Sequence, residues 1–104
     1  MFDFIKNLFK GKGDIAKLVK EGAVIVDVRT KGEYHSGHIE GSRNIPLDNI
    51  QKEASALKNL NKPVVIVCRS GNRSGMAKSI LAAAGIEAYN GGAWITLKKQ
   101  IQQL

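Results

Sequence analysis

The sequence predicts an α/β fold with a small, mostly parallel sheet that is flanked by helices on both faces. Two short apolar runs, residues 23–26 and 64–67, are rich in β-branched side chains, as is typical of strands buried on both faces of a sheet. Helical stretches separate these runs, which gives the alternation found in α/β proteins. At 104 residues, the chain is long enough for one domain with its own core.

The amino-terminal segment, residues 1–13, is expected to be distinct from the domain that follows at 14–104. Phe2, Ile5 and Phe9 would share one face of a short amphipathic helix over residues 2–10. Gly11 and Gly13 break that pattern and predict a hinge. We expect this helix to pack back on the domain rather than to dock on a membrane surface or a partner.

The first helix of the domain is expected over residues 15–21. Asp14 is a suitable N-cap, and Gly22 stands where a C-cap glycine belongs. After the strand at 23–26, residues 44–47 are expected to include a brief extended piece that ends at Pro46. A helix then follows over 48–60, in which Asp48 and Gln51 have the spacing of a capping box.

The second half of the chain repeats the alternation. The apolar strand at 64–67 leads through a tight loop into an alanine-rich helical pattern over residues 76–84, which Gly85 would end. A final strand is expected at 86–90, and a last helix at 95–103. No internal repeat interrupts this order.

Composition limits the functions that the chain can have. Its net charge is +7, from 16 basic and nine acidic residues, but the lysines are scattered, so we expect a surface that attracts small anions rather than nucleic acid. A single cysteine cannot form an internal disulfide, and its neighbours predict neither a metal site nor a cofactor. Without a signal peptide or a membrane-spanning stretch, we expect a cytoplasmic monomer with a reduced thiol.

The single cysteine, Cys68, begins a short segment between the second apolar strand and a helix, Cys68-Arg69-Ser70-Gly71-Asn72-Arg73-Ser74. Open α/β sheets place ligand sites at this junction. A helix amino terminus and two neighbouring guanidinium groups both favour the thiolate, and Gly71 gives the loop conformational freedom. We therefore expect Cys68 to be a nucleophile that needs no histidine base, rather than a buried structural cysteine.

Four segments resemble those of the single-domain rhodanese family of sulfurtransferases, the thiosulfate sulfurtransferases. They are the Asp-Val-Arg end of the first strand at 25–29, the Glu-Tyr-x-x-Gly-His-Ile-x-Gly stretch at 33–41 with Asn-Ile-Pro-Leu at 44–47, the cysteine loop at 68–74, and Tyr-Asn-Gly-Gly at 89–92. The resemblance covers about residues 14–97 and implies the three-layer rhodanese-like fold. One departure is that only Ala93 separates Gly92 from Trp94, where many relatives have three residues.

The resemblance also implies a mechanism. Cys68 would take the outer sulfur of thiosulfate, or of a persulfide donor, as a persulfide and pass it to cyanide or to a thiol such as thioredoxin or glutathione. Backbone N–H groups of the loop would stabilise the sulfur anions. Substrate-binding residues would be Arg69, Ser70, Gly71, Asn72 and Arg73.

The residues around the loop are expected to support it. Arg69 is the better candidate to face the substrate, because it follows the cysteine directly. Arg73 would either contact the substrate or pair with a carboxylate. Asp27 and Glu33 are the candidate partners, since the segments that contain them end near the same sheet edge as the cysteine loop. Arg29 would help to hold the strand end, and His35 and His38 are expected to be structural.

Three other functions remain open at this point. Cysteine phosphatases and arsenate reductases also use a thiolate before a helix, but phosphatases have five residues between the cysteine and the arginine, whereas Cys68 and Arg73 have four. A non-catalytic rhodanese-like binding module commonly lacks the cysteine that is present here. A redox-sensing thiol is also compatible with an activated cysteine.

Overall fold

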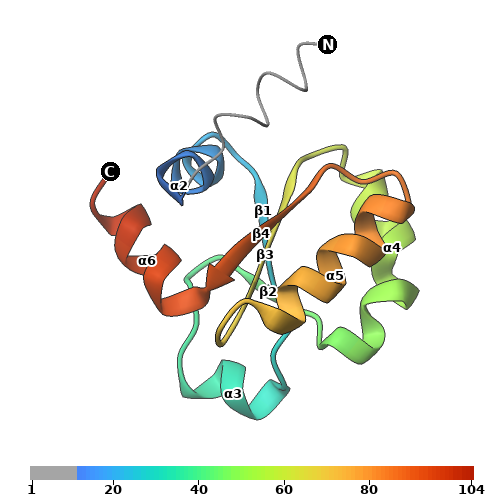
Figure 1. The fold of residues 1–104 in the computed structure, drawn as a ribbon, viewed down its shortest axis with the longest axis horizontal. Coiled ribbons are helices and arrows are strands. Elements are labelled where there is room, and N and C mark those ends of the chain that lie inside the picture. Colours follow the sequence, from blue (N-terminus) through green and yellow to red (C-terminus); the bar gives the residue numbers. More distant parts are fainter. Residues whose placement is uncertain (1–11) are drawn as a thin grey trace.

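The structure, a computed structural model, describes residues 12–104 and contains a four-stranded parallel sheet (Figure 1). The strands β1 (Val24–Asp27), β2 (Arg43–Asn44), β3 (Val64–Cys68) and β4 (Ala88–Ala93) lie in the order β2-β1-β3-β4. Every pair of neighbouring strands in this sheet is parallel. The predicted α/β class is thus confirmed. The helix expected at 2–10 lies outside the described residues, and of the hinge expected at 11–13 the two described residues, 12 and 13, are part of a helix instead.

Helices cover both faces of the sheet and make a three-layer arrangement (Figure 1). On one face, α4 (Ile50–Asn59) and α5 (Asn72–Ala83) pack on Val26, Val64 and Ile66. On the other face, α2 (Lys12–Lys20) and α6 (Trp94–Gln102) pack on alternate strand residues, Ile25, Val65 and Val67. Successive side chains of a strand point to opposite faces, so both apolar runs serve two cores at once.

The short helix α3 (Lys31–Ser36) lies beyond the carboxyl edge of the sheet. It begins with a complete capping box, in which Thr30 and Glu33 satisfy each other's backbone N–H groups. The Thr-x-x-Glu spacing is a standard signal for such a box, although no helix over residues 31–36 is predicted from the sequence. Helix α3 presents Glu33 to Arg73, which follows the cysteine loop.

Two predicted helix starts are wrong. Asp14 is the third residue of α2 rather than its N-cap, because the helix begins at Lys12. Asp48 and Gln51 form no capping box: Asp48 lies in a 3-10 turn (Leu47–Asn49), and α4 begins only at Ile50, without a side-chain cap. Gly22, by contrast, has the expected left-handed conformation at the end of α2, with a φ of 114°.

The elements after β3 are displaced from their predicted positions. Helix α5 begins at Asn72, four residues earlier than the apolar pattern indicated. Strand β4 begins at Ala88 rather than at residue 86, and the register with β3 shifts at Gly91, which has no partner in the ladder. A Cβ on Gly91 would lie 2.7 Å from a methyl group of Val65, so this bulge requires glycine.

Within residues 12–104, no helix is both long enough and apolar enough to cross a lipid bilayer.

Candidate functional site

The loop between β3 and α5 holds Cys68 at the carboxyl edge of the sheet. Strand β3 ends at Cys68 and α5 begins at Asn72, so the connection has only three residues. Gly71 makes the turn with a φ of 106°, in the left-handed region that glycine adopts without strain. This sharp turn directs backbone N–H groups of the loop and of the first helical turn toward the sulfur.

Hydrogen-bonding groups surround the sulfur of Cys68. The N–H of Gly71 donates to Sγ over 2.9 Å, and Ser74 Oγ lies 3.3 Å from Sγ. Burial raises the pKa of the thiol, but hydrogen bonds from the Ser74 hydroxyl and from the N–H groups of Ser74, Gly71 and Ser70 more than offset this effect. The pKa of Cys68 is therefore lower than that of an ordinary cysteine, and the thiolate is favoured.

The two arginines of the loop have different surroundings. Arg73 forms a bidentate ion pair with Glu33 of α3, at 2.8 Å and 3.0 Å. Arg69 is exposed, and its guanidinium has no partner among the described residues. Hydrogen bonds from the loop N–H groups and from Ser74 are the main causes that lower the pKa of Cys68, and the charge of Arg73 also interacts with the thiolate.

Glu33 ties the cysteine loop to α3. The Arg73 guanidinium and, next, the Thr30 N–H hold the pKa of Glu33 at about 2, below its ordinary value of 4.5. Hydrogen bonding to Glu33 in turn raises the pKa of Arg73. Of the two carboxylates considered for Arg73, Glu33 is thus its partner.

Asp27 has a different partner, Arg29, and the two form a buried ion pair. Arg29 Nη2 lies 2.7 Å from Asp27 Oδ2, and the two residues are 4% and 0% exposed, respectively. The same guanidinium donates to the backbone carbonyls of Glu33 and Gly37, at 3.1 Å and 2.7 Å, and lies 4.5 Å from the ring centre of Trp94. Arg29 therefore links the backbone at Glu33 in α3, and at the Gly37 C-cap, to Asp27 at the end of β1.

The other predicted residues are less closely tied to the sulfur. The side chains of Ser70 and Asn72 are exposed, and Asn72 begins α5. His38 stacks on Tyr34 with ring centres 3.8 Å apart, and its Nδ1 lies 2.8 Å from the Tyr34 carbonyl. His35 contacts the edge of the same ring. Among residues 12–104, no three acidic, histidine or cysteine side chains are grouped to hold a metal ion.

Two residues at the site were not singled out from the sequence. Ser74, which is fully buried, contacts Cys68 and donates a hydrogen bond of 2.7 Å to Asn90 Oδ1. Asn90 comes from β4 and also donates to the Gly71 carbonyl over 3.1 Å. Ser74 could have been suspected from its place at the end of the loop, but no local signal points to Asn90.

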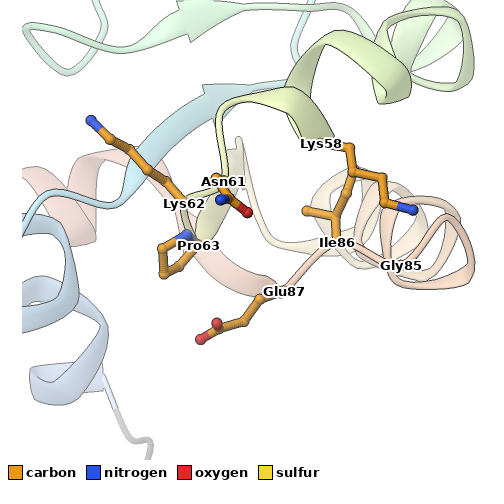
Figure 2. Close-up of a pocket in the computed structure, with 7 residues that line it drawn as sticks. All are labelled: Lys58, Asn61, Lys62, Pro63, Gly85, Ile86 and Glu87. Atoms are coloured by element: carbon orange, nitrogen blue, oxygen red, sulfur yellow. The ribbon is translucent and has the colours of Figure 1, made fainter.

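A hollow at the opposite edge of the sheet offers no comparable chemistry. It lies where β3 and β4 begin and is lined by Lys58, residues 61–63 and residues 85–87. Figure 2 shows the amino groups of Lys58 and Lys62 pointing away from each other. Because these charges diverge, the cysteine loop is the better candidate for the functional site.

Comparisons with known proteins match most of the chain to one family. The family model described as "Rhodanese-like domain" matches residues 12–93. The uncharacterized protein YqhL of Bacillus subtilis is 39% identical over 65% of this chain and 54% of its own length. The thiosulfate sulfurtransferase PspE of Escherichia coli is 38% identical over 58% of this chain and 59% of its own length. These matches thus span little more than half of each curated relative.

Solved structures share the fold. A crystal structure of a rhodanese-like domain protein from Staphylococcus aureus aligns with a TM-score of 0.71 and 31% identity. That alignment covers 84% of this chain and 86% of the other.

Proposed function

The chain belongs to the rhodanese-like domain family, and on that premise we propose that it is a sulfurtransferase in which Cys68 carries the transferred sulfur. One observation carries the proposal: the donors of the loop converge on a single sulfur atom, with the Gly71 N–H at 2.9 Å from Sγ. A lowered pKa supplies the thiolate that such a reaction needs.

The proposed reaction has two displacement steps. The Cys68 thiolate attacks the outer sulfur of a donor such as thiosulfate, so that a new S–S bond forms, the S–S bond of the donor breaks, and sulfite leaves with the electron pair. An acceptor thiolate, or cyanide, then attacks the outer sulfur of the persulfide, and Cys68 leaves as a thiolate. The hydrogen bonds that lower the pKa of Cys68 also stabilise it as this leaving group.

A small anionic donor suits the surroundings of Cys68. The residue is 1% exposed, so only a narrow reagent can approach its sulfur past the loop. Arg69 is exposed and would attract an anion. Relatives of this chain include proteins named thiosulfate sulfurtransferase, which supports thiosulfate as the donor. Thioredoxin or glutathione would be suitable thiol acceptors.

The alternative of a cysteine phosphatase is disfavoured by Arg73. In a phosphatase the arginine of the loop must be free to hold phosphoryl oxygens. Here Arg73 is engaged by both carboxylate oxygens of Glu33. The loop is also one residue shorter than a phosphatase loop, which suits one sulfur atom better than three oxygens.

The test is intact-mass spectrometry of the protein after treatment with thiosulfate. Because the chain has one cysteine, a gain of one sulfur atom reports directly on Cys68. We expect cyanide or a thiol to remove this sulfur with formation of thiocyanate or a persulfidated thiol. The variant Cys68→Ser should gain no sulfur.

Two results would count against sulfur transfer. One is wild-type protein that stays unmodified with thiosulfate and with a persulfide donor, which would favour a binding module. The other is hydrolysis of p-nitrophenyl phosphate at a rate comparable to that of sulfur transfer, which would favour a phosphatase. The variant Ser55→Ala, at an exposed position of α4, serves as a control that should behave like the wild type.

A further inference from the structure

The hydroxyl group of Ser74 has one proton and two neighbouring acceptors. Oγ lies 2.7 Å from Asn90 Oδ1 and 3.3 Å from Cys68 Sγ, and in the structure it donates to Asn90. While it does so, its contact with Sγ can only be one in which a thiol S–H donates to Oγ. If Sγ is a thiolate, the hydroxyl must instead turn and donate to the sulfur.

The orientation of the Asn90 amide is fixed at both ends. Its Oδ1 accepts from the Gly92 N–H over 2.9 Å, and its Nδ2 donates to the Gly71 carbonyl over 3.1 Å. A flipped amide would set donor against donor at Gly92 and acceptor against acceptor at Gly71. Oδ1 therefore faces Ser74 and remains satisfied by Gly92 when the hydroxyl turns away.

Burial makes the choice of acceptor important. Ser74 is 0% exposed, so a hydroxyl proton without an acceptor would be left unsatisfied in the interior, which is costly. A thiolate can accept a hydrogen bond from this hydroxyl, whereas the neutral sulfur of a thiol, or the inner sulfur of a persulfide, is a poor hydrogen-bond acceptor. The hydroxyl thus needs a second acceptor whenever Sγ is uncharged.

We propose that Asn90 is a positioning residue. Its Oδ1 accepts a hydrogen bond from the Ser74 hydroxyl whenever Cys68 Sγ is uncharged, and the hydroxyl donates to Sγ instead when the sulfur becomes an anion. No proton leaves Ser74 in this exchange: the hydrogen bond to Asn90 Oδ1 breaks and a hydrogen bond to Sγ forms. Asn90 therefore stabilises the uncharged states of Sγ relative to the thiolate.

This inference rests on the proposed function for its role in catalysis. During sulfur transfer, Sγ would be charged before attack, uncharged in the persulfide and charged again on release. The Ser74 hydroxyl would donate a hydrogen bond to Sγ while Cys68 attacks or leaves as a thiolate. Between these steps, in the persulfide, it would donate to Asn90 Oδ1. The loop would then need no backbone movement to adapt to each state.

The charged groups around Cys68 are the same with and without Asn90. They are Arg69 and Arg73 on the loop and at the start of α5, Glu33 of α3, which pairs with Arg73, and the buried Asp27–Arg29 pair at the end of β1. A neutral substitution of Asn90 removes none of them. A change in the pKa of Cys68 in such a variant would thus report on hydrogen bonding.

The test is the pH dependence of alkylation of the single cysteine by iodoacetamide, followed by mass spectrometry. In Asn90→Ala, Ser74 loses its acceptor at Oδ1 and keeps the one at Sγ, so we expect the pKa of Cys68 to fall by about 0.5 to 1, the scale of one neutral hydrogen bond. Alkylation well below that pKa should then be about three- to tenfold faster. Asn90→Leu, which keeps the side-chain volume, should give the same shift, and Asn59→Ala should give none.

A double variant separates this role from simple support of the loop. Ser74→Ala should raise the pKa of Cys68, and Asn90→Ala should have no further effect in that background. If Asn90→Ala raises the pKa instead, and does so equally without Ser74, then Asn90 merely anchors Gly71 and the proposal is wrong. Because alkylation involves no sulfur donor, this result can be read even if the chain transfers no sulfur.

Discussion

The ion pair between Glu33 and Arg73 gives a prediction that can be worked out from the structure. The change Glu33→Gln removes the charge but keeps the capping box, because glutamine serves as well as glutamate at that position. The pKa of Glu33 falls from 4.5 to about 2 in the folded protein, which at about 1.4 kcal/mol per pKa unit corresponds to about 3 kcal/mol. The two side chains are 33% and 31% exposed, so solvent screening reduces the expected loss to about 1 kcal/mol.

The sign of the pH dependence follows from the direction of this shift. A carboxyl group with a lowered pKa in the folded state contributes its full stability above its unfolded pKa, near 4.5, and loses it as the pH falls toward about 2. We therefore expect wild type and Glu33→Gln to differ by about 1 kcal/mol at pH 7 and at pH 5. At pH 3 the difference should have fallen by about half or more.

The assay is urea unfolding monitored by circular dichroism at each pH, with Glu53→Gln as the matched control. Glu53 lies on the exposed face of α4, so the same chemical change there should cost less than about 0.5 kcal/mol. Two outcomes would refute the reasoning: a difference that does not change between pH 7 and pH 3, or a loss at Glu53 equal to that at Glu33.

Three further predictions concern the core, the buried ion pair and the thiol. Gly91→Ala should destabilise the protein by about 1–3 kcal/mol, because its Cβ would lie 2.7 Å from a valine methyl of β3; Gly32→Ala, with no atom within 4 Å, should be neutral or stabilising by thermal unfolding. Arg29→Lys should lose about 2–3 kcal/mol in urea, because lysine cannot replace the bonds to Asp27 and to two carbonyls; wild-type stability would contradict this. The alkylation rate of Cys68 should rise with pH through a midpoint below about 8.5, since its pKa is lowered; a midpoint at or above that value would contradict the site geometry.

The position of the cysteine loop is the part of the site that was predicted best. The apolar run before Cys68 and Gly71 after it are local signals of a strand and a sharp turn. A strand that ends in such a turn places its last residue, here Cys68, at the carboxyl edge of a parallel sheet. The helix starts at Asp14 and Asp48 were predicted less well. Both residues are good caps in isolation, but α2 begins two residues before Asp14 and α4 begins two residues after Asp48.

The source of the activated thiol was also only partly predictable. The sequence places two arginines beside Cys68, which suggested that their charges lower its pKa. In the structure Arg73 turns to Glu33 and Arg69 faces solvent, while the donors are the loop N–H groups and Ser74. Side-chain directions in a tight loop depend on its exact backbone angles, which residue types alone do not specify.

By itself, the sequence determined the α/β class, the two buried strands and the loop that carries Cys68, because apolar periodicity and turn residues act over a few positions. Only the tertiary structure decided which groups act on that loop. Glu33 reaches Arg73 across 40 positions of the chain, and Asn90 reaches Ser74 across 16. Such partners meet because parallel strands bring their carboxyl ends to one edge of the sheet, and the angle and register at which they do so are fixed by packing across both cores.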